Sequence, residues 1–559
     1  MKLKKVKIMK KNNYIYILNI ILPILSIQNS NTHAKKEVSL LEHHNISFQK
    51  NYEAKWKQLF DTSLTDNPIA LANQFKTALE KNTFLSFSNQ PFYLGLSSSA
   101  YQFEGGIGDE SSWHRFALKR GHALPGKACN FWDNYKEMIK QMKEECHINS
   151  FRLSISWERL QKKQRSFDYV ALAKYKDIIR ELKNNGIEPL VVLHHYTIPT
   201  WFEDLGGFEK EENITYFVEF AKEVYKALAD EVTYWSTFNA IEGYAFKGYY
   251  TLDGAPGIKK DMQTTTEVMC NMLKAHVAIY RAIKGITAEQ SAGLWQQLQE
   301  QHPDTNLPCP QIGIQKNIMF LDLAYDSWMH YVMAPTSWAL CCMGNLMQND
   351  GFYDFFNLGT FKIYIPFMVD VSYTDYAAPF TLDWIGVNTY ANQKRFLMSV
   401  VEDKDEQLTT LNKNYRYYPQ GLYRAVKEIQ KRINGGLYTI DRKLLRNRTV
   451  PIWITENGIA AHSDEQREDF FKKTLFIVTK LLQEPLPIIG YTPWAAFDNY
   501  EWGSKKLGDK RYGMLHYYFP DPNQKQLGQQ TKPTLKSGSL FFAQFCKEVN
   551  HFKTDLTIH

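Results

Sequence analysis

The chain has 559 residues, of which 44% are hydrophobic and 22% charged, a composition that is typical of a folded globular protein and argues against a disordered one. The formal net charge is +7, but six positive charges are lysines within the first eleven residues, so the rest of the chain is close to neutral. This distribution argues against a nucleic-acid-binding body, and we expect no nucleic-acid partner. Aromatic residues reach 14%, which suits a protein that stacks flat rings against a ligand such as a sugar.

The first segment of the chain has the three parts of a secretory signal. Lysines are followed by an apolar run, Tyr14–Ile27, and then by the small residues around Ala34. We therefore predict a signal peptide over residues 1–34 and a secreted, periplasmic or lumenal protein. The apolar run is short for a bilayer span, which needs about 20 residues. An uncleaved membrane anchor formed by residues 14–27 is the alternative, and it would be the only membrane contact.

The cysteines and glycines predict neither a metal site nor a bound cofactor. The seven cysteines contain no Cys-x-x-Cys pair and no paired Cys/His spacing, so we expect buried free thiols and no structural zinc. The glycines Gly105, Gly106 and Gly108 are too closely spaced for a dinucleotide fingerprint. Activity is accordingly expected to survive treatment with a chelator.

From about residue 92 onward, short apolar runs alternate with longer amphipathic ones. Eight runs predict strands, several of them apolar on both faces, and helical patterns separate them, which together predict an α/β fold of the (β/α)8 TIM barrel type. We assign residues 91–559 to this barrel, residues 35–90 to a helical or irregular N-terminal extension, and 288–312 and 400–418 to excursions at the rim. The predicted strands are Phe92–Ala100, Asn149–Ser156, Ile187–His195, Val232–Asn239, Ile312–Phe320, Leu382–Tyr390, Pro451–Glu456 and Ile488–Trp494. The predicted helices include Asp168–Asn185, Ile214–Ala229, Thr265–Ile286, Leu422–Ile433 and Phe470–Gln483.

Polar and aromatic residues gather where the predicted strands end. Active sites of such barrels lie at the carboxyl ends of the strands, so these residues predict a polar pocket with aromatic walls. The residues at the strand ends are Gln102, Glu104, Arg152, His194, His195, Tyr196, Asn239, Asn388, Tyr390, Glu456, Asn457 and Trp494.

Several of these residues stand in ordered motifs that resemble glycoside hydrolase family 1, the β-glucosidase family. The resemblance runs from about Phe92 to about Phe519. It rests on Ser99-Ala100-Tyr101-Gln102-Phe103-Glu104-Gly105, Phe151-Arg152-Leu153-Ser154-Ile155-Ser156-Trp157, Leu193-His194-His195-Tyr196, Ile454-Thr455-Glu456-Asn457-Gly458, and Trp494 with Asp498-Asn499-Tyr500-Glu501-Trp502.

The resemblance implies a retaining mechanism in which Glu456 is the nucleophile. Retaining enzymes hold two carboxyl groups about 5–5.5 Å apart, one attacking the anomeric carbon and one protonating the leaving oxygen. Arg152 and Tyr390 are then expected to hydrogen-bond the Glu456 carboxylate, which keeps it ionised and correctly aimed.

The resemblance also implies a set of sugar-binding residues. A hexose offers hydroxyls that donate and accept hydrogen bonds and one apolar face, so amides, an imidazole, a carboxylate and indoles suit it. Glu501 implies an unphosphorylated β-linked glycoside as substrate, because a carboxylate would repel a phosphate. His194 is expected to pack inside its strand. Gluco or galacto preference, the aglycone and the oligomeric state stay open. The implied sugar-binding residues are Gln102, His195, Asn239, Asn388, Trp494, Glu501 and Trp502.

One position departs from the family pattern. The family's fourth strand ends Asn-Glu-Pro, whose glutamate is the general acid/base, whereas here Asn239 is followed by Ala240 and Ile241. Such a group contributes about 10²–10⁴-fold to the rate. Glu242 lies two residues further on, and we expect it to be a rim carboxylate and not a substitute acid.

Four interpretations of Ala240 are open. The chain is an engineered glutamate-to-alanine variant, a natural enzyme that needs no strong acid (as in thioglucoside-cleaving relatives), a carbohydrate-binding pseudoenzyme, or a barrel with a purely structural role. The rest of the implied pocket is intact, which favours catalysis or sugar binding, because a chain that had lost its function would also be expected to lose other pocket residues. We therefore expect a β-glycosidase whose catalytic power is reduced by Ala240.

Overall fold

The computed structural model describes most of the chain, and the predicted signal peptide, residues 1–34, lies outside the described residues. Also outside are most of the predicted excursion 288–312 and three cysteines, Cys309, Cys341 and Cys342. The described residues are 46–88, 91–258, 261–285, 310–324, 344, 346–390, 392–396, 399–401, 405–413, 415–438, 444–446, 448–519 and 532–556.

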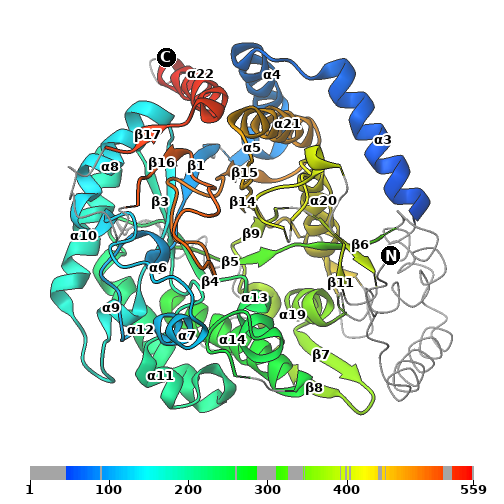
Figure 1. Cartoon of the computed structure of the whole chain (residues 1–559). Coiled ribbons are helices and arrows are strands. Elements are labelled where there is room, and N and C mark those ends of the chain that lie inside the picture. Colours follow the sequence, from blue (N-terminus) through cyan, green and yellow to red (C-terminus); the bar gives the residue numbers. More distant parts are fainter. Residues whose placement is uncertain are drawn as a thin grey trace, which may run out of the picture.

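Eight parallel strands close into a barrel, in the order β1-β15-β14-β9-β5-β4-β3-β2 (Figure 1). Each of these strands lies inside a predicted strand or extends one residue beyond it, so the prediction of a (β/α)8 barrel is confirmed. The strands are buried along almost their whole length, which explains why their sequences are apolar on both faces. They are β1 (Tyr93–Ser97), β2 (Ser150–Ser154), β3 (Glu188–Val192), β4 (Tyr234–Asn239), β5 (Gln311–Asn317), β9 (Trp384–Asn388), β14 (Ile452–Glu456) and β15 (Ile488–Tyr491).

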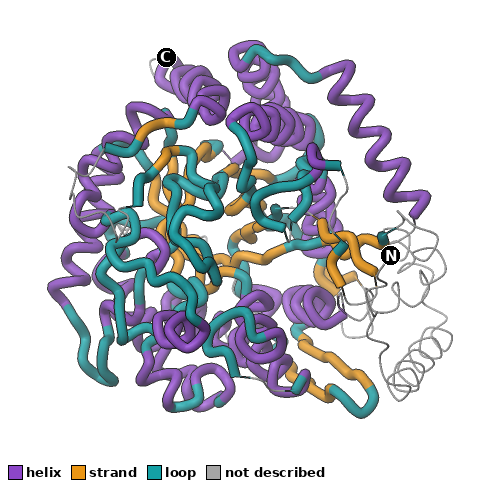
Figure 2. Tube along the Cα trace, in the orientation of Figure 1, coloured by secondary structure: helices purple, strands orange, loops and turns teal. Residues whose placement is uncertain are grey.

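Helices surround the barrel and cover its outer face (Figure 2). The predicted helices are present, and two of them begin several residues earlier than predicted. Helix α14 starts at Met262 and not at Thr265, because Asp261 caps it by accepting a hydrogen bond from the Thr264 amide. Helix α21 starts at Asp464 and not at Phe470, because Ser463 caps it by accepting a hydrogen bond from the Gln466 amide. The main helices are α8 (Phe131–Cys146), α10 (Tyr169–Asn184), α12 (Ile214–Leu228), α14 (Met262–Lys284), α19 (Gly351–Leu358), α20 (Gly421–Ile433), α21 (Asp464–Leu482) and α22 (Leu540–Leu556).

Shorter elements lie in the connections between these strands and helices. The short helices are α6 (Ala100–Phe103), α7 (Ser112–Arg120), α9 (Trp157–Leu160), α11 (Thr200–Asp204), α13 (Ile241–Phe246), η1 (Gly207–Glu209), η2 (Glu211–Asn213), η3 (Lys247–Thr251), η4 (Leu346–Asp350), η5 (Ala378–Phe380), η6 (Glu406–Leu408) and η7 (Ser537–Ser539). The short strands are β6 (Phe320–Leu323), β7 (Thr360–Ile365), β8 (Val369–Thr374), β10 (Asn392–Phe396), β11 (Ser399–Val400), β12 (Leu437–Tyr438), β13 (Leu444–Arg446), β16 (Leu515–His516) and β17 (Thr534–Leu535).

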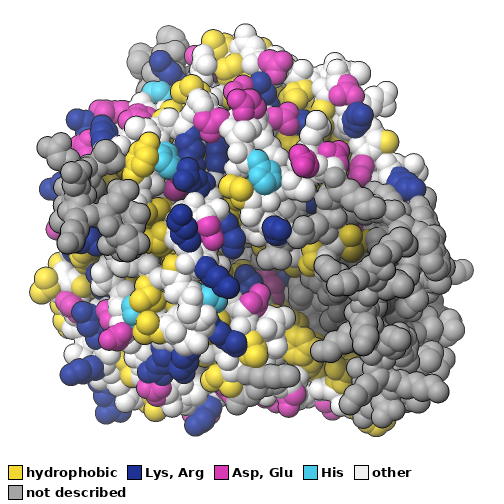
Figure 3. Space-filling model, in the orientation of Figure 1, with side chains coloured by type: hydrophobic (Ala, Val, Ile, Leu, Met, Phe, Trp, Pro, Cys, Tyr) yellow, Lys and Arg dark blue, Asp and Glu magenta, His cyan; other side chains and the backbone are white. Residues whose placement is uncertain are grey.

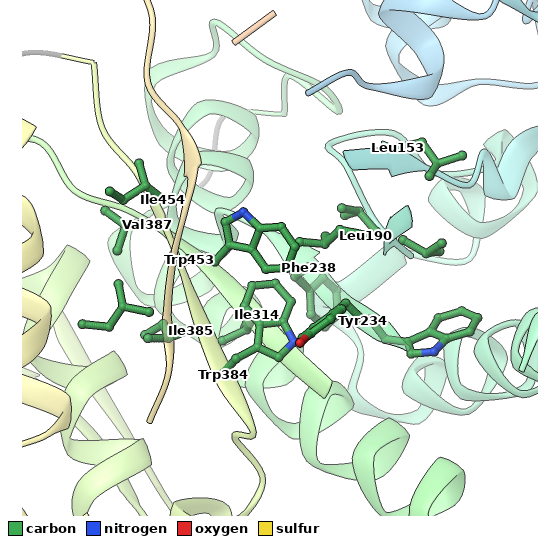
Figure 4. Close-up of a cluster of buried hydrophobic side chains, with 14 of the residues drawn as sticks. Leu153, Leu190, Tyr234, Phe238, Ile314, Trp384, Ile385, Val387, Trp453 and Ile454 are labelled. Carbon is green, nitrogen blue, oxygen red and sulfur yellow. The ribbon is translucent and has the colours of Figure 1, made fainter. Parts of the chain in front are cut away.

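Aromatic side chains fill the barrel at the amino-terminal end of its strands (Figure 4). Trp453 stacks on Tyr93 with ring centroids 4.7 Å apart, and Tyr234 meets it edge-on at 5.2 Å. Gly490 on the neighbouring strand makes room for this indole, because a Cβ there would lie 2.6 Å from Trp453 Nε1. The filled end leaves the carboxyl ends of the strands as the place for a site.

Residues 46–88, the described part of the predicted N-terminal extension, are helical and pack on the outside of the barrel. They form α3 (Ile46–Ser63), α4 (Pro68–Lys81) and α5 (Thr83–Ser88). Helix α4 begins after Asn67, whose side chain caps it, and contacts α21 and α22. The Asn82 side chain then donates hydrogen bonds to Leu482 O (3.2 Å) and Leu486 O (3.1 Å), which fastens the extension to the barrel.

The four described cysteines are free and buried, as the sequence predicts. Burial raises the pKa of the Cys129 and Cys546 thiols well above their usual range, so both are unreactive. Within the described ranges, no helix has the length and apolar character of a membrane span. Acidic and basic side chains are interspersed over the described part of the face in Figure 3.

Candidate active site

The carboxylate of Glu456 lies at the carboxyl end of β14 and is held on both sides. Arg152 on β2 places Nη2 2.6 Å from Glu456 Oε1, and the Tyr390 hydroxyl, just beyond β9, donates to Oε2. Glu456 is only 6% exposed. Burial and the Glu456 charge raise the pKa of Tyr390 well above its usual range, so the phenol keeps its proton and remains a donor. The two contacts fix the carboxylate in one orientation.

Arg152 is fully buried and links Glu456 to two other strands. Its Nη1 donates to Asn239 Oδ1 at the end of β4 (3.2 Å) and to Gln315 Oε1 on β5. A buried guanidinium needs such partners, because an unpaired buried charge costs several kcal/mol. Gln315 is a site residue that was not predicted, although a polar residue beside Gly313 and Ile314 in a buried strand is a signal for it.

Asn239 is oriented by a chain of side-chain hydrogen bonds. Asn388 Nδ2 donates to Asn239 Oδ1 (2.7 Å), as Arg152 does, so the Asn239 amide nitrogen faces His195 Nε2 at 3.0 Å. The other ring nitrogen, His195 Nδ1, then donates to Ser154 Oγ at 3.0 Å. Burial lowers the pKa of His195 well below its usual range, and the nearby Arg152 adds to the effect. The imidazole is therefore neutral.

Asn388 lies behind Asn239, with both ends of its amide engaged. Its Oδ1 accepts a hydrogen bond of 2.7 Å from Thr455 Oγ1, while its Nδ2 holds Asn239. A sugar contact through Asn388 would require the exchange of one of these bonds, so its main effect in this structure is to orient Asn239.

Three further residues of the predicted sugar site present polar groups. Gln102 donates through Nε2 to Tyr500 O (2.6 Å), while its buried Oε1 has no hydrogen-bond partner in the described part of the chain. The Trp494 indole donates to Glu501 Oε1 (3.3 Å). Burial raises the pKa of Glu501 to about 8, so its carboxyl group is largely protonated at neutral pH.

Aromatic rings form one wall beside these groups. Trp502 lies edge-on to Trp113 (4.2 Å) and Tyr196 (5.8 Å), and it stacks with Tyr101 (5.9 Å). Tyr196, in the loop that follows β3, has a left-handed φ of 67°, which is uncommon for a large side chain. These rings offer the apolar surface that a sugar ring requires.

His194 packs among aromatic rings, as the sequence analysis expects. Its ring lies 5.3 Å from that of Phe238 and 5.1 Å from that of Tyr244. Burial lowers its pKa to about 3, so the imidazole is uncharged. It faces the strand–helix packing and contributes no polar group to the site.

Position 240 joins β4 to α13. Ala240 is 1% exposed, has a left-handed φ of 49°, and donates its backbone N–H to Gln315 O (2.9 Å). Glu242 is turned toward the end of β5, where it accepts from the Asn317 amide (2.8 Å) and pairs with Lys316 Nζ (3.2 Å). Both contacts are made by Oε1, whereas the buried Oε2 has no hydrogen-bond partner in the described part of the chain. The pairing of Oε1 with Lys316 agrees with a structural role for Glu242.

Tyr415 reaches the site from a region that the sequence analysis described only as a rim excursion. Its ring stacks on Tyr390 with centroids 5.5 Å apart and planes 13° apart. Tyr512 meets Tyr390 edge-on at 5.9 Å. Tyr390 therefore contacts Glu456 at its hydroxyl and two further rings at its faces. No periodic pattern in residues 400–418 could have indicated this contact.

The fold and the strand-end residues together define a barrel with a carboxylate-centred site of the glycosidase kind. The family model described as glycosyl hydrolase family 1 matches residues 85–548, so the chain belongs to that family and the resemblance in its sequence is confirmed.

Relatives of the chain carry more than one activity in their names. The chain is 25% identical over 476 residues to a 6-phospho-beta-galactosidase of Clostridium acetobutylicum, covering 78% of this chain and 93% of the relative. It is 26% identical over 464 residues to beta-glucosidase A of Acetivibrio thermocellus, covering 77% and 93%. Among solved structures, a beta-glycosidase from Pyrococcus horikoshii is 27% identical, with a TM-score of 0.63 over 82% of this chain and 94% of that one.

Proposed function

We propose that the protein is a retaining β-glycosidase that cleaves the O-glycosidic bond of an unphosphorylated β-D-glycoside through a glycosyl-enzyme on Glu456. The observation that carries this proposal is the Glu456 carboxylate, which is held between a buried guanidinium and a phenol at the carboxyl end of the barrel. Arg152 stabilises its charge, and Tyr390 fixes its direction.

In the first step, Glu456 attacks the anomeric carbon and the bond to the aglycone oxygen breaks, so the electron pair leaves with that oxygen. Arg152 remains paired with the carboxylate group as its charge is lost to the new ester bond. An acid at position 240 would supply a proton to the departing oxygen, and Ala240 cannot. The step is therefore fast only when the leaving group departs as a stable anion.

In the second step, water attacks the anomeric carbon and Glu456 departs as a carboxylate. The proton of the water has to reach solvent without a base at position 240, so this step is slow and the glycosyl-enzyme accumulates. An anion such as azide needs no deprotonation and should attack faster than water does.

Glu501 supports an unphosphorylated substrate. Its carboxyl group contacts the Trp494 indole, and within the described ranges no Lys or Arg forms an ion pair with it. A phosphate beside this buried group would be repelled by its ionised form and would raise its pKa further. The 6-phospho-beta-galactosidase among the relatives makes the comparison of plain and 6-phosphorylated sugars a necessary part of the test.

Two alternatives differ in what they require of position 240. A thioglycosidase or transglycosidase needs no strong general acid, and it would use the same Glu456. A carbohydrate-binding pseudoenzyme would keep the contacts to the sugar and form no bond to Glu456. The intact contacts of Glu456 favour a glycosidase, thioglycosidase or transglycosidase over a binding protein, because a binding protein has no need for a nucleophile held on both sides.

The proposal is tested by turnover of dinitrophenyl β-glucoside, the matching β-galactoside, their 6-phosphates and a thioglucoside, each with and without azide. We expect azide to accelerate turnover of an unphosphorylated sugar and to give a β-glycosyl azide, the product of two inversions at the anomeric carbon. An α-glycosyl azide, or turnover of the 6-phosphates alone, would contradict it.

A further inference from the structure

Helix α3 lies outside the residues that match the family, which begin at residue 85. Tyr52, Trp56 and Phe60 recur at every fourth position, so they lie on one face of this helix, and all three pack in or against the main hydrophobic core. Trp56 meets Tyr423 of α20 edge-on at 5.2 Å, and Phe60 meets Phe476 of α21 at 6.1 Å. Most of the stability of a helix in a protein comes from the packing of its apolar face, so packing against the barrel is what maintains α3.

The same helix is bonded to residues 405–413 and 415–420, which we call the bridging segment. Tyr52 OH donates to Gln420 O (2.9 Å), and Arg416 Nη1 donates to Glu53 Oε1 (2.7 Å). The Arg416 side chain is 8% exposed and that of Glu53 26%, so the ion pair is shielded from solvent more than a surface pair is. Both contacts join parts of the chain that are more than 360 residues apart.

The bridging segment connects α3 to the active site through successive side chains. Arg416 faces α3, Tyr417 donates from its hydroxyl to Asp469 of α21, and Tyr415 stacks on Tyr390, which in turn donates to Glu456. The Tyr415 carbonyl is fixed by Thr410 Oγ1 at 2.9 Å. Neighbouring residues of one extended stretch thus contact the helix, the barrel wall and the site.

The contact between α3 and the bridging segment is not a continuous core. A groove of about 1040 Å³ lies between them, and its lining includes Glu53, Lys57, Phe60, Arg416 and Gln466. Because water can fill this groove, the bonds of Tyr52 and Glu53 are specific links between α3 and the segment across it. The segment is also bonded to the barrel, where Leu411 N donates to Ala460 O (2.8 Å) and Gln466 Nε2 donates to Thr409 O (2.9 Å).

We propose that α3 is a positioning element of the active site: Glu53 and Tyr52 hold the bridging segment so that Tyr415 supports Tyr390 against the nucleophile. Glu53, Tyr52 and Tyr415 are positioning residues, since they act through Tyr390. The catalytic consequence rests on the proposed function of Glu456, whereas the mechanical link between α3 and Tyr415 does not.

The test uses the full chain with Glu53→Gln, which removes the charge and keeps the shape, and Tyr52→Phe, which removes one hydroxyl. Glu80→Gln is the matched control, because Glu80 is an exposed acid on the same extension, on α4. Hydrogen–deuterium exchange of peptides covering 405–420 measures how readily the bridging segment opens, and it needs no substrate. The rate of glycosylation by a dinitrophenyl 2-deoxy-2-fluoro-glucoside, and the affinity for an iminosugar, report the site.

We expect Glu53→Gln to raise exchange in the 405–420 peptides about five-fold and to lower the glycosylation rate about 3- to 10-fold, with Glu80→Gln unchanged in both. In the double variant with Tyr415→Leu, the loss from Glu53→Gln should disappear, because both substitutions break one pathway. A purely structural α3 would give additive kinetic losses that follow the melting temperature.

The outcomes separate the positioning role of α3 from the proposed function of Glu456. Unchanged exchange in 405–420, or raised exchange with unchanged glycosylation and iminosugar affinity, overturns the role of α3. If the unmodified chain is not glycosylated at all, the proposed function fails, and exchange together with iminosugar affinity still decides whether α3 positions the site.

Discussion

Replacing Ala240 by glutamate should restore the missing acid/base on a backbone that is already in place. The backbone N–H of residue 240 is bonded to Gln315 O (2.9 Å), and its neighbour Asn239 is held by Arg152 and Asn388. A left-handed φ costs an L-residue about 1–2 kcal/mol. Alanine at φ 49° already bears that cost, so glutamate adds no new backbone strain.

The size of the effect depends on the leaving group. A general acid is typically worth about 10²–10⁴-fold, and each factor of ten corresponds to about 1.4 kcal/mol of activation free energy. For an alkyl β-glucoside we expect kcat/KM to rise by about 10²–10⁴-fold. For a dinitrophenyl glucoside the glycosylation rate should stay nearly constant, since its leaving group needs no proton.

The assay compares Ala240→Glu with Ala240→Gln, which fills the same space without a transferable proton. Initial rates on the alkyl and dinitrophenyl substrates are measured beside the melting temperature of each variant. Equal rates for the glutamate and glutamine variants would refute an acid role at position 240. So would a folded glutamate variant that is glycosylated normally but gains nothing on the alkyl substrate.

Other predictions concern the charges and packing around the site. Arg152→Met should destabilise the protein by about 3–5 kcal/mol, because the Glu456 carboxylate loses its buried partner; urea unfolding that shows no change would contradict the pairing. Folding raises the pKa of Glu501 from 4.5 to about 8, so between these pH values the group is protonated in the folded state and ionised in the unfolded state. The free energy of unfolding should therefore fall as the pH rises from about 4.5 to about 8. A sugar whose hydroxyls bond the carboxylate should therefore release a proton on binding at pH 7, measurable by calorimetry in two buffers, and Glu501→Gln should abolish the release. Gly490→Ala should cost about 1–3 kcal/mol by pressing on Trp453, and an unchanged unfolding midpoint would show that the indole has room to move.

The barrel could be predicted because its strands are short, buried and apolar and its helices are periodic, so each element is encoded locally. That Glu456 and Arg152 lie together could be predicted because strand ends converge in such a barrel and both residues stand in motifs. The contacts of Gln315 and Tyr415 could not be predicted. They depend on which side chains meet across the folded barrel, as do those of Glu53, whose partner Arg416 lies 363 residues away. A contact between residues so far apart in the chain leaves no pattern in the sequence around either residue.

The proposed function requires Glu456 to form a covalent bond with the sugar. The direct measurement is the mass of the protein and of its Glu456 peptide after incubation with a dinitrophenyl 2-deoxy-2-fluoro-β-glucoside, beside Glu456→Gln. We predict one added fluoroglycosyl group on Glu456, accumulating because no base at position 240 helps water to remove it, and none on the variant. A chain that binds an iminosugar and gains no mass would be a carbohydrate-binding protein, which would contradict the account.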